Sequence, residues 1–276
     1  MIKITLGHSP DPDDAFMFYG IASGNVSAEG IEFEQILQDI ETLNRRALQG
    51  ELDVTAVSIH AYAYLSDRYA LLPHGASFGD GYGPMVVSRR PMNPSQLRGL
   101  RIAIPGTLTS AYLALRLYQS EFEPIVVPFD QIPEAVLSGE AEAGLLIHEG
   151  QLTYAASGLH LVVDLGVWWK EETGLPLPLG GNAIRKALGA ATITKVAKAL
   201  HESIAYGLEH RAPGLAYAEQ WGRGLDRPLA DRFVGMYVND LTLDYGDRGR
   251  RAVRLFLERG RAAGLITVEP QVEFAG

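Results

Sequence analysis

A repeated alternation of strands and helices constrains the fold of this chain more than any other feature of its sequence. Short apolar segments followed by helical segments run from Ile2 to Ser88, and the same alternation begins again at Arg101. The segment between them, Arg89–Gly99, carries two prolines and three arginines. Because strands that alternate with helices form parallel sheets, the two blocks predict two α/β lobes with a ligand cleft between them.

A proline-rich segment predicts the path back from the second lobe to the first. Residues 167–184 contain Trp168 and Trp169, followed by Pro176 and Pro178. Proline fits neither a helix interior nor a central strand, so we interpret this segment as an extended return crossing. The large lobe is therefore expected to comprise residues 1–92 and 180–276, and the small lobe residues 93–179.

The C-terminal third is expected to be helical. Apolar residues recur at three- and four-residue spacing over 193–208, 214–221, 228–237 and 248–263. These four segments predict helices that pack on the first lobe. The short tail after Leu265 is expected to be loosely ordered.

The composition excludes several classes of function. The formal net charge is −9, whereas a nucleic-acid partner requires a basic surface. The chain has no cysteine, which excludes disulfides, thiolate catalysis and cysteine-ligated metal. It carries no HExxH motif, dinucleotide fingerprint or P-loop, so the motifs give little support to metal binding and none to dinucleotide binding. With no membrane-length apolar run and no secretion signal, we expect a cytoplasmic protein without membrane insertion; the oligomeric state stays open.

Polar residues follow the ends of several predicted strands, where the ligand crevice of an open α/β sheet lies. The strand Val54–Ser58 runs directly into a predicted helix, and Thr109 and Ser110 begin the helix after Arg101–Ile104. Their hydroxyl groups, with the free N–H groups of the first helical turn, predict a seat for a carboxylate or phosphate. The alternative is that they only cap the helix.

Three aspartates follow the first strand. Ser9 or Asp11 can cap the helix that begins there, with Pro12 in its first turn, and Asp13 and Asp14 suit the positive end of the helix dipole. Capping alone is one interpretation, and a place in the ligand crevice is the other.

His148 is the candidate for proton transfer. It follows Ala143–Ile147, an uncharged and mostly branched segment that suits a strand buried on both faces. An imidazole at the mouth of such a strand can exchange a proton near neutral pH, because its unperturbed pKa is about 6.5. A buried histidine with a purely structural role is the alternative interpretation.

Five segments in order resemble the 1,4-dihydroxy-6-naphthoate synthase family, which acts in the futalosine route to menaquinone. They are SPDPDDAFMF, DIETLNRRAL, PGTLTSAY, AGLLIHEGQLTY, and GLPLPLG after the Trp-Trp pair. The resemblance implies a fold like that of type II periplasmic binding proteins, with the ligand between two lobes. It also implies a lyase that converts cyclic dehypoxanthine futalosine, a small anionic substrate, to 1,4-dihydroxy-6-naphthoate without cofactor or metal.

The resemblance also implies roles for individual residues. His148 matches the family's proton acceptor, and Asn44 matches the polar residue of its ETLN motif. Substrate contacts are implied at two further groups of residues, which are Ala56, Val57 and Ser58, and Thr109, Ser110 and Ala111.

The chain departs from the family at SPDPDD, where SPCPND is common. Asp11 and Asp13 therefore stand where the family usually has neutral residues. Whether these side chains and Asp14 contact the substrate stays open, as does the identity of the group that orients His148.

Three other functions are alternatives. Chorismate dehydratase of the same pathway shares the fold, but the ETLN and IHEGQLTY segments favour the naphthoate synthase. A solute-binding protein for a small anion would share the lobes and cleft without chemistry, and would normally carry an export signal or a lipobox cysteine. A ligand-sensing domain of a regulator would normally carry a DNA-binding helix pair with a basic face.

Overall fold

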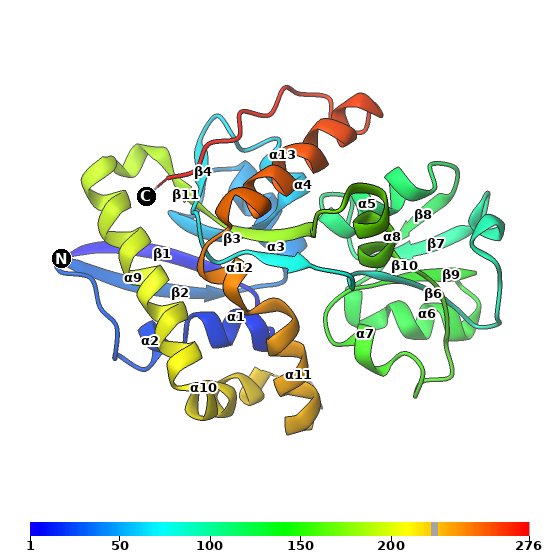
Figure 1. Cartoon of the computed structure of the whole chain (residues 1–276), viewed down its shortest axis with the longest axis horizontal. Helices are drawn as coiled ribbons and strands as arrows, with labels where there is room; N and C mark the ends of the chain where they lie inside the picture. The colour runs from blue at the N-terminus through cyan, green and yellow to red at the C-terminus, as the bar shows by residue number, and fades with distance from the viewer. Residues whose placement is uncertain (222–225, 276) are drawn as a thin grey trace.

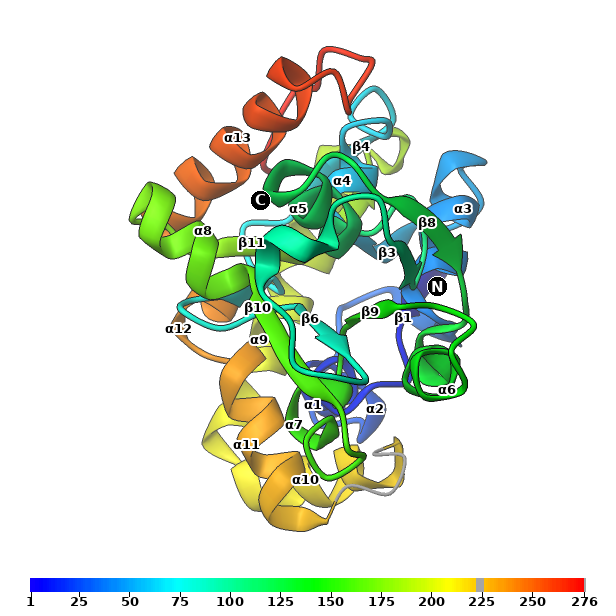
Figure 2. The ribbon, with the colours of Figure 1, turned by 90° about the vertical axis from the view of Figure 1, so that its right-hand side faces the viewer.

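Two β-sheets lie side by side along the long axis of the molecule (Figures 1 and 2). The structure is a computed structural model that describes residues 1–221 and 226–275. The first sheet has the strand order β2-β1-β3-β11-β4, with β5 paired to β11, and the second sheet has the order β10-β6-β9-β7-β8. We call each sheet with its covering helices a lobe. The expected mixed α/β architecture is confirmed.

The two sheets are built alike. In each, three strands of one block are parallel, and a fourth strand pairs antiparallel with the third. The strands of the first sheet are β1 (Ile2–His8), β2 (Ile31–Leu37), β3 (Val54–Ser58), β4 (Tyr69–Leu71), β5 (Ser77–Gly79) and β11 (Leu177–Arg185). Those of the second are β6 (Met85–Ser88), β7 (Arg101–Ile104), β8 (Glu123–Val126), β9 (Ala143–Leu146) and β10 (His160–Asp164). The ends of β1 and β3 therefore correspond to the ends of β7 and β9.

Helices and short turns connect these strands. The α-helices are α1 (Pro12–Met17), α2 (Tyr19–Ala22), α3 (Ile40–Leu48), α4 (Ile59–Tyr62), α5 (Ser110–Tyr118), α6 (Ile132–Ser138), α7 (Gly150–Thr153), α8 (Leu165–Thr173), α9 (Ala190–Glu209), α10 (Arg211–Ala218), α11 (Arg227–Tyr237), α12 (Asp240–Leu243) and α13 (Gly246–Ala262). The 3-10 turns are η1 (Pro94–Leu97), η2 (Phe129–Gln131), η3 (Lys186–Leu188) and η4 (Glu219–Trp221).

Helices cover both faces of each sheet, and apolar side chains on the strands alternate accordingly. On one face of the first sheet, Ile4 belongs to a buried cluster with Phe16 of α1 and Leu200 of α9, and on the other face Val57 belongs to a cluster with Phe256 of α13. In the second lobe, α5 and α8 cover one face of the sheet and α6 covers the other (Figure 2). The cluster around Val57 extends into the second sheet, so the lobes share part of their core.

The limits of the sheets differ from the expected lobe limits at one strand. The chain passes from the first sheet to the second between β5 and β6, and it returns between β10 and β11. The strand β6 lies in the second sheet, although residue 92 was the expected end of the first segment. The limits 1–92 with 180–276, and 93–179, stay a prediction.

The expected form of the return segment was wrong. Trp168 and Trp169 lie in the helix α8, and β11 after it is a central strand that pairs with β3 and β4. The prolines are tolerated because Pro178 pairs only with the short strand β5, beside a break in register, and pairing with β3 begins at Gly180.

The C-terminal tail is held by the first sheet, and the expected loose order was wrong. Phe274 forms a parallel bridge with Leu71 of β4, and the N–H of Ala275 donates to the Leu71 carbonyl at 2.8 Å. The Phe274 ring also contacts Tyr245 edge-on, with centroids 5.5 Å apart. An aromatic anchor therefore orders a segment with no helix or strand of its own.

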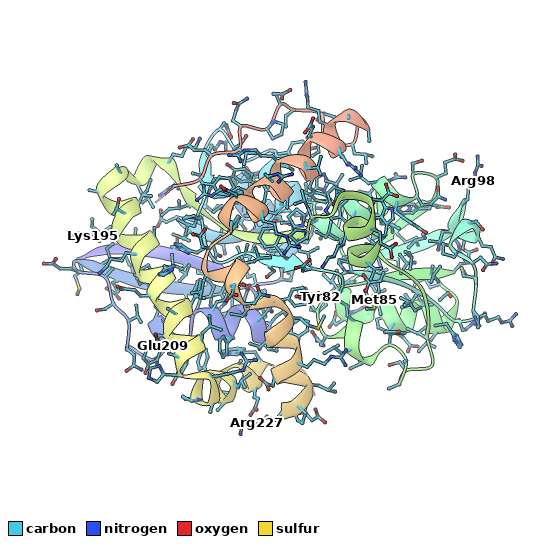
Figure 3. All side chains as sticks on the ribbon, viewed as in Figure 1. Tyr82, Met85, Arg98, Lys195, Glu209 and Arg227 are labelled. Carbon is cyan, nitrogen blue, oxygen red and sulfur yellow. The ribbon has the colours of Figure 1, made fainter. Side chains whose placement is uncertain are left out.

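Charged side chains lie at the periphery. Figure 3 shows Arg98, Lys195, Glu209 and Arg227 on the outside, and all four are exposed. Within the described ranges, no helix is long and apolar enough to cross a membrane.

Candidate active site

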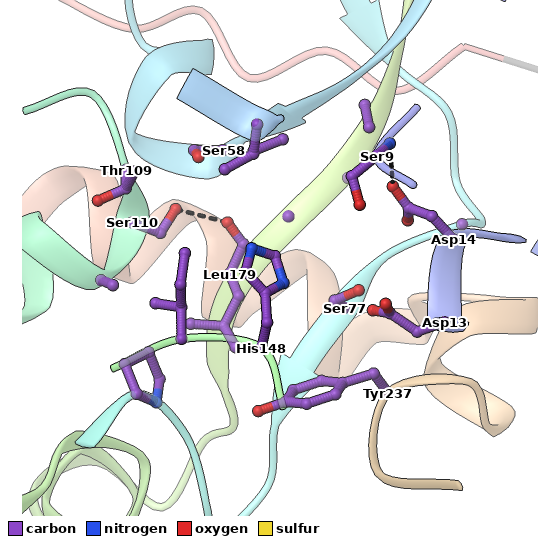
Figure 4. Close-up of a pocket in the computed structure, with 18 of the residues that line it drawn as sticks. Ser9, Asp13, Asp14, Ser58, Ser77, Thr109, Ser110, His148, Leu179 and Tyr237 are labelled. Atoms are coloured by element: carbon purple, nitrogen blue, oxygen red, sulfur yellow. Dashed lines mark hydrogen bonds between the residues drawn. The ribbon is translucent and has the colours of Figure 1, made fainter. Parts of the chain in front are cut away.

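A pocket lies between the two sheets, at the ends of corresponding strands. Ser9 follows β1 and Ser58 ends β3 in the first sheet, whereas Thr109 follows β7 and His148 follows β9 in the second. All four residues line the pocket, and Figure 4 shows their side chains around a common space. Open α/β sheets bind ligands at this position, and here two sheets contribute to one site.

Most of the residues predicted from the sequence line this pocket. Those that do are Ala56, Ser58, Thr109, Ser110, Ala111 and His148. Val57 does not, because its side chain points to the opposite face of β3 and is fully buried in the core. Asn44 lies behind Ser58: its Nδ2 donates to the Ser58 hydroxyl at 3.0 Å, and its Oδ1 accepts from the Ser58 N–H at 2.8 Å. Asn44 therefore positions Ser58.

The start of α5 faces the pocket with backbone N–H groups. The hydroxyl of Thr109 accepts from the Tyr112 N–H at 3.2 Å and caps the helix, as one interpretation of the sequence expected. The Ser110 hydroxyl donates to the carbonyl of Leu179 in β11 at 2.5 Å, a contact between the lobes (Figure 4). Both hydroxyl groups therefore already have hydrogen-bond partners within the protein. The N–H groups of Ser110 and Ala111 lie in the first turn, where no intrahelical carbonyl faces them, and can bind an anion.

His148 has an unusual backbone conformation. Its φ is 55°, and among residues 1–221 and 226–275 it is the only non-glycine residue with a positive φ. Such a conformation costs on the order of 1–3 kcal/mol, and outliers of this kind cluster at active sites. The strain favours a functional role for His148 over a purely structural one.

The imidazole of His148 is held by an aspartate from the other lobe. Nδ1 of His148 lies 3.1 Å from Oδ2 of Asp11, and the Phe129 ring contacts the imidazole edge-on with centroids 4.8 Å apart. The Asp11 side chain is only 3% exposed, and its Oδ2 also accepts from the Ser9 hydroxyl. When Nδ1 donates to this carboxylate, Nε2 of the neutral ring is left as a proton acceptor.

Helix capping does not explain Asp11. It occupies the N-cap position of α1, but its side chain makes no capping hydrogen bond. The acidic run SPDPDD was the only sequence signal, and it could not show a partner from a distant block. Asp11 is therefore a site residue whose role sequence reasoning left open.

Two further carboxyl groups lie at the side of the pocket away from α5 (Figure 4). Asp14 accepts from the Ser9 N–H at 2.8 Å, and burial raises its pKa. Asp13 is 8% exposed and lines the pocket, and its hydrogen-bonding neighbours are N–H groups in the first turn of α1. Burial raises the pKa of Asp13 well above its usual range, and the charges of Asp14 and Asp11 add to this. Asp13 therefore favours its uncharged form, which can donate a hydrogen bond.

A second hydrogen bond joins the lobes across the pocket. The hydroxyl of Tyr237 in α11 donates to Oε1 of Gln151 in α7 at 2.7 Å, and both side chains are buried. Burial raises the pKa of Tyr237, so its hydroxyl keeps its proton. Neither residue was predicted, because helical periodicity placed their segments without showing that they meet.

The charge of the lining limits how a ligand is held. No lysine or arginine is among the described residues that line the pocket. In the same part of the chain, no group of three or more His, Cys, Asp or Glu side chains is arranged to hold a metal ion. A carboxylate in this pocket would therefore be held by N–H and hydroxyl groups rather than by a cation.

Sequence comparison shows which family this chain resembles over its full length. A family model described as menaquinone biosynthesis matches residues 4–262. The chain belongs to this family. A curated relative, the 1,4-dihydroxy-6-naphthoate synthase of Thermus thermophilus, is 43% identical over 274 residues, which cover 99% of this chain and 100% of the relative. The expected membership of the naphthoate synthase family, and with it an enzyme of menaquinone biosynthesis, is confirmed.

Comparison with solved structures identifies the fold of this menaquinone-biosynthesis enzyme. Protein AF1704 from Archaeoglobus fulgidus is 49% identical, with a TM-score of 0.92 over 96% of this chain and 98% of that one. A Candida albicans protein described as having the generic periplasmic binding protein fold is 12% identical, with a TM-score of 0.67 over 100% of this chain and 99% of that one. The expected two-lobe fold like that of periplasmic binding proteins is confirmed.

Proposed function

We propose that this menaquinone-biosynthesis enzyme is a lyase that converts cyclic dehypoxanthine futalosine to 1,4-dihydroxy-6-naphthoate and releases the sugar-derived fragment. The observation that carries the proposal is the pairing of His148 with Asp11 in a pocket that also contains the start of α5. Similarity over the full chain to a relative named for this product supports it.

His148 is the proposed general base. In a retro-aldol-like step, the base removes the proton of a hydroxyl group on the carbon next to the carbon–carbon bond that breaks. That carbon becomes a carbonyl group of the released fragment, and the electron pair of the broken bond passes into the ring system that becomes aromatic. Nε2 of His148 takes that proton, and the Asp11 carboxylate stabilises the imidazolium that results. A positioned base of this kind contributes roughly 10²–10⁴-fold to the rate.

The start of α5 is the proposed seat for the substrate carboxylate. The N–H groups of Ser110 and Ala111 donate to it, and the Ser58 hydroxyl lies on the same side of the pocket (Figure 4). Asn44 acts through Ser58, which it holds by two hydrogen bonds.

Thr109, Ala56 and Val57 complete the proposed set of contacts. Thr109 acts by capping α5, and Ala56 forms part of the pocket wall. Val57 has its side chain in the core, so only its backbone can serve the substrate. The proposed reaction needs no oxidant or reductant. We also propose that it takes place in the cytoplasm.

Product analysis tests the proposed reaction. The purified protein is incubated with cyclic dehypoxanthine futalosine and, separately, with chorismate, and the products are identified by mass. We expect 1,4-dihydroxy-6-naphthoate from the first compound and no change in the second. Loss of water from chorismate would identify a chorismate dehydratase instead, and conversion of neither compound would identify a binding protein without catalysis.

A further inference from the structure

The pocket has two chemically different ends, and the proposed carboxylate site at the start of α5 occupies only one of them. Figure 4 shows Ser58, Thr109 and Ser110 on one side of His148, and Asp13, Asp14 and Ser77 on the other. The first end offers N–H groups to an anion. The second end has two buried carboxyl groups, and no lysine or arginine among the described residues of the lining offers an anion a positive charge there.

A buried amide without a partner belongs to the second end. Asn182 of β11 is 1% exposed and lines the pocket, and among the described residues its Nδ2 has no hydrogen-bond partner. It contacts the backbone at Gly75, because a Cβ placed there would lie 2.1 Å from Nδ2. Gly75 and Ser77 also line the pocket, and Figure 4 shows Ser77 on the same side of His148 as Asp13. A buried donor without an acceptor is unfavourable unless a ligand supplies one.

Asp13 supplies the complementary group. Its carboxyl group lines the pocket and has no hydrogen bond to a side chain in the described parts of the chain. Burial favours its uncharged form, which both donates and accepts. Together with the amide of Asn182, it suits a ligand group that also donates and accepts, and a hydroxyl group does both.

We propose that this end of the pocket is a subsite for the hydroxyl-bearing, sugar-derived part of the substrate, recognised by Asp13 and Asn182. The inference rests on the proposed function, in which the carboxylate binds at α5. The ring system then lies beside His148, and the fragment to be released extends toward Asp13. The bond that breaks therefore lies between the two ends of the pocket, within reach of the base.

Binding measurements with two ligands test this subsite. Titration calorimetry is done on the full chain in a His148→Asn background, so that substrate is not consumed. Cyclic dehypoxanthine futalosine carries the hydroxyl-bearing fragment, and 1,4-dihydroxy-6-naphthoate lacks it. We expect Asp13→Ala to weaken binding of the first compound by about tenfold and of the second by less than about twofold. Asp13→Asn, which keeps a donor and an acceptor, should stay close to the parent.

Ser110→Ala serves as the comparison at the other end of the pocket. It keeps the backbone N–H but removes the hydrogen bond to Leu179 that joins the lobes, so it should weaken both ligands. Equal loss of both ligands in Asp13→Ala, or no loss of either, would overturn the subsite and leave the proposed reaction standing. If neither ligand binds the parent, the proposed function fails and the inference fails with it. If circular dichroism shows that Asp13→Ala is unfolded, Asn182→Ala must show the same selective loss, and its absence overturns the proposal.

Discussion

The Asp11 carboxylate lies 3.1 Å from Nδ1 of His148, and the two residues come from different sheets. Asp11 follows β1 of the first lobe, and His148 follows β9 of the second. Any separation of the lobes would break this pair, together with the bond between Tyr237 and Gln151. Closure of the pocket and orientation of the proposed base are therefore linked.

Replacing Asp11 by Asn should lower kcat by about tenfold to a hundredfold, as a part of the general-base contribution, and should change KM by less than about threefold. The variant keeps the shape of the side chain but loses the charge that stabilises the imidazolium. Steady-state kinetics measures both constants. Asp226→Asn makes the same change at the exposed N-cap of α11, where Asn caps as well as Asp, and should leave kcat unchanged. A wild-type kcat in Asp11→Asn would refute the proposed stabilisation of the imidazolium by the Asp11 charge.

Asn44→Ala should lower the free energy of unfolding by about 1–3 kcal/mol, because two buried hydrogen bonds to Ser58 are lost. KM should rise as well, since the Ser58 hydroxyl is no longer fixed toward the pocket. Urea denaturation and kinetics measure the two effects. Asn25→Ala, at an exposed position, is the matched control and should change stability by less than about 0.5 kcal/mol. An unchanged KM in Asn44→Ala would argue against a role for Ser58 in binding.

Tyr237→Phe should raise the Kd for substrate by roughly threefold to tenfold, the value of one hydrogen bond. The change removes the donor to Gln151 and weakens the link between the lobes. Titration calorimetry measures the effect in a His148→Asn background. Gln151→Ala should add little to Tyr237→Phe, because the two residues act through the same bond. If the two substitutions changed the Kd in a fully additive way, the hydrogen bond between Tyr237 and Gln151 would not be the cause of either change.

Two buried histidines should make the free energy of unfolding depend on pH. Burial lowers the pKa of His60 to about 4, and burial with the neighbouring His201 lowers that of His74 to about 4. Because the unfolded chain binds these protons first, the stability they contribute is complete above pH 6.5 and is lost as the pH falls toward 4. Between pH 6.5 and 5, the loss should be roughly 3 kcal/mol for both together.

Urea denaturation at successive pH values measures this loss. His60→Gln should remove about half of it, because one titrating group remains. Burial raises the pKa of Asp13 and Asp14, so these groups change the stability in the opposite direction over the same pH range. The histidine contribution is therefore the difference between the wild type and His60→Gln, and a difference that is constant from pH 6.5 to 5 would contradict the assignment.

Local patterns predicted the elements that short-range interactions determine. The bounds of β3 and β7 were predicted correctly, and Thr109 caps α5 by accepting from the Tyr112 N–H at 3.2 Å. The strand β11 was missed because prolines argue against a central strand, and only its neighbours show that Pro178 lies outside the main pairing. The tail was missed because its order depends on Phe274 reaching a distant strand.

The same difference between short-range and long-range interactions applies to the site. The rule that ligands bind at strand ends placed Ser58, Thr109 and His148 in one pocket. Partners from distant elements were not visible, because nothing in the local sequence of Asp11 or Asn182 shows which residues of a distant element they face. These contacts depend on how the two lobes meet.

The turnover of His148→Asn tests the central claim most directly. Asn accepts a positive φ more readily than most residues, so the fold should be kept. We predict that this variant still gains thermal stability from cyclic dehypoxanthine futalosine but forms 1,4-dihydroxy-6-naphthoate at least about 10²-fold more slowly than the wild type. Product formation at the wild-type rate would contradict the assignment of His148 as the base.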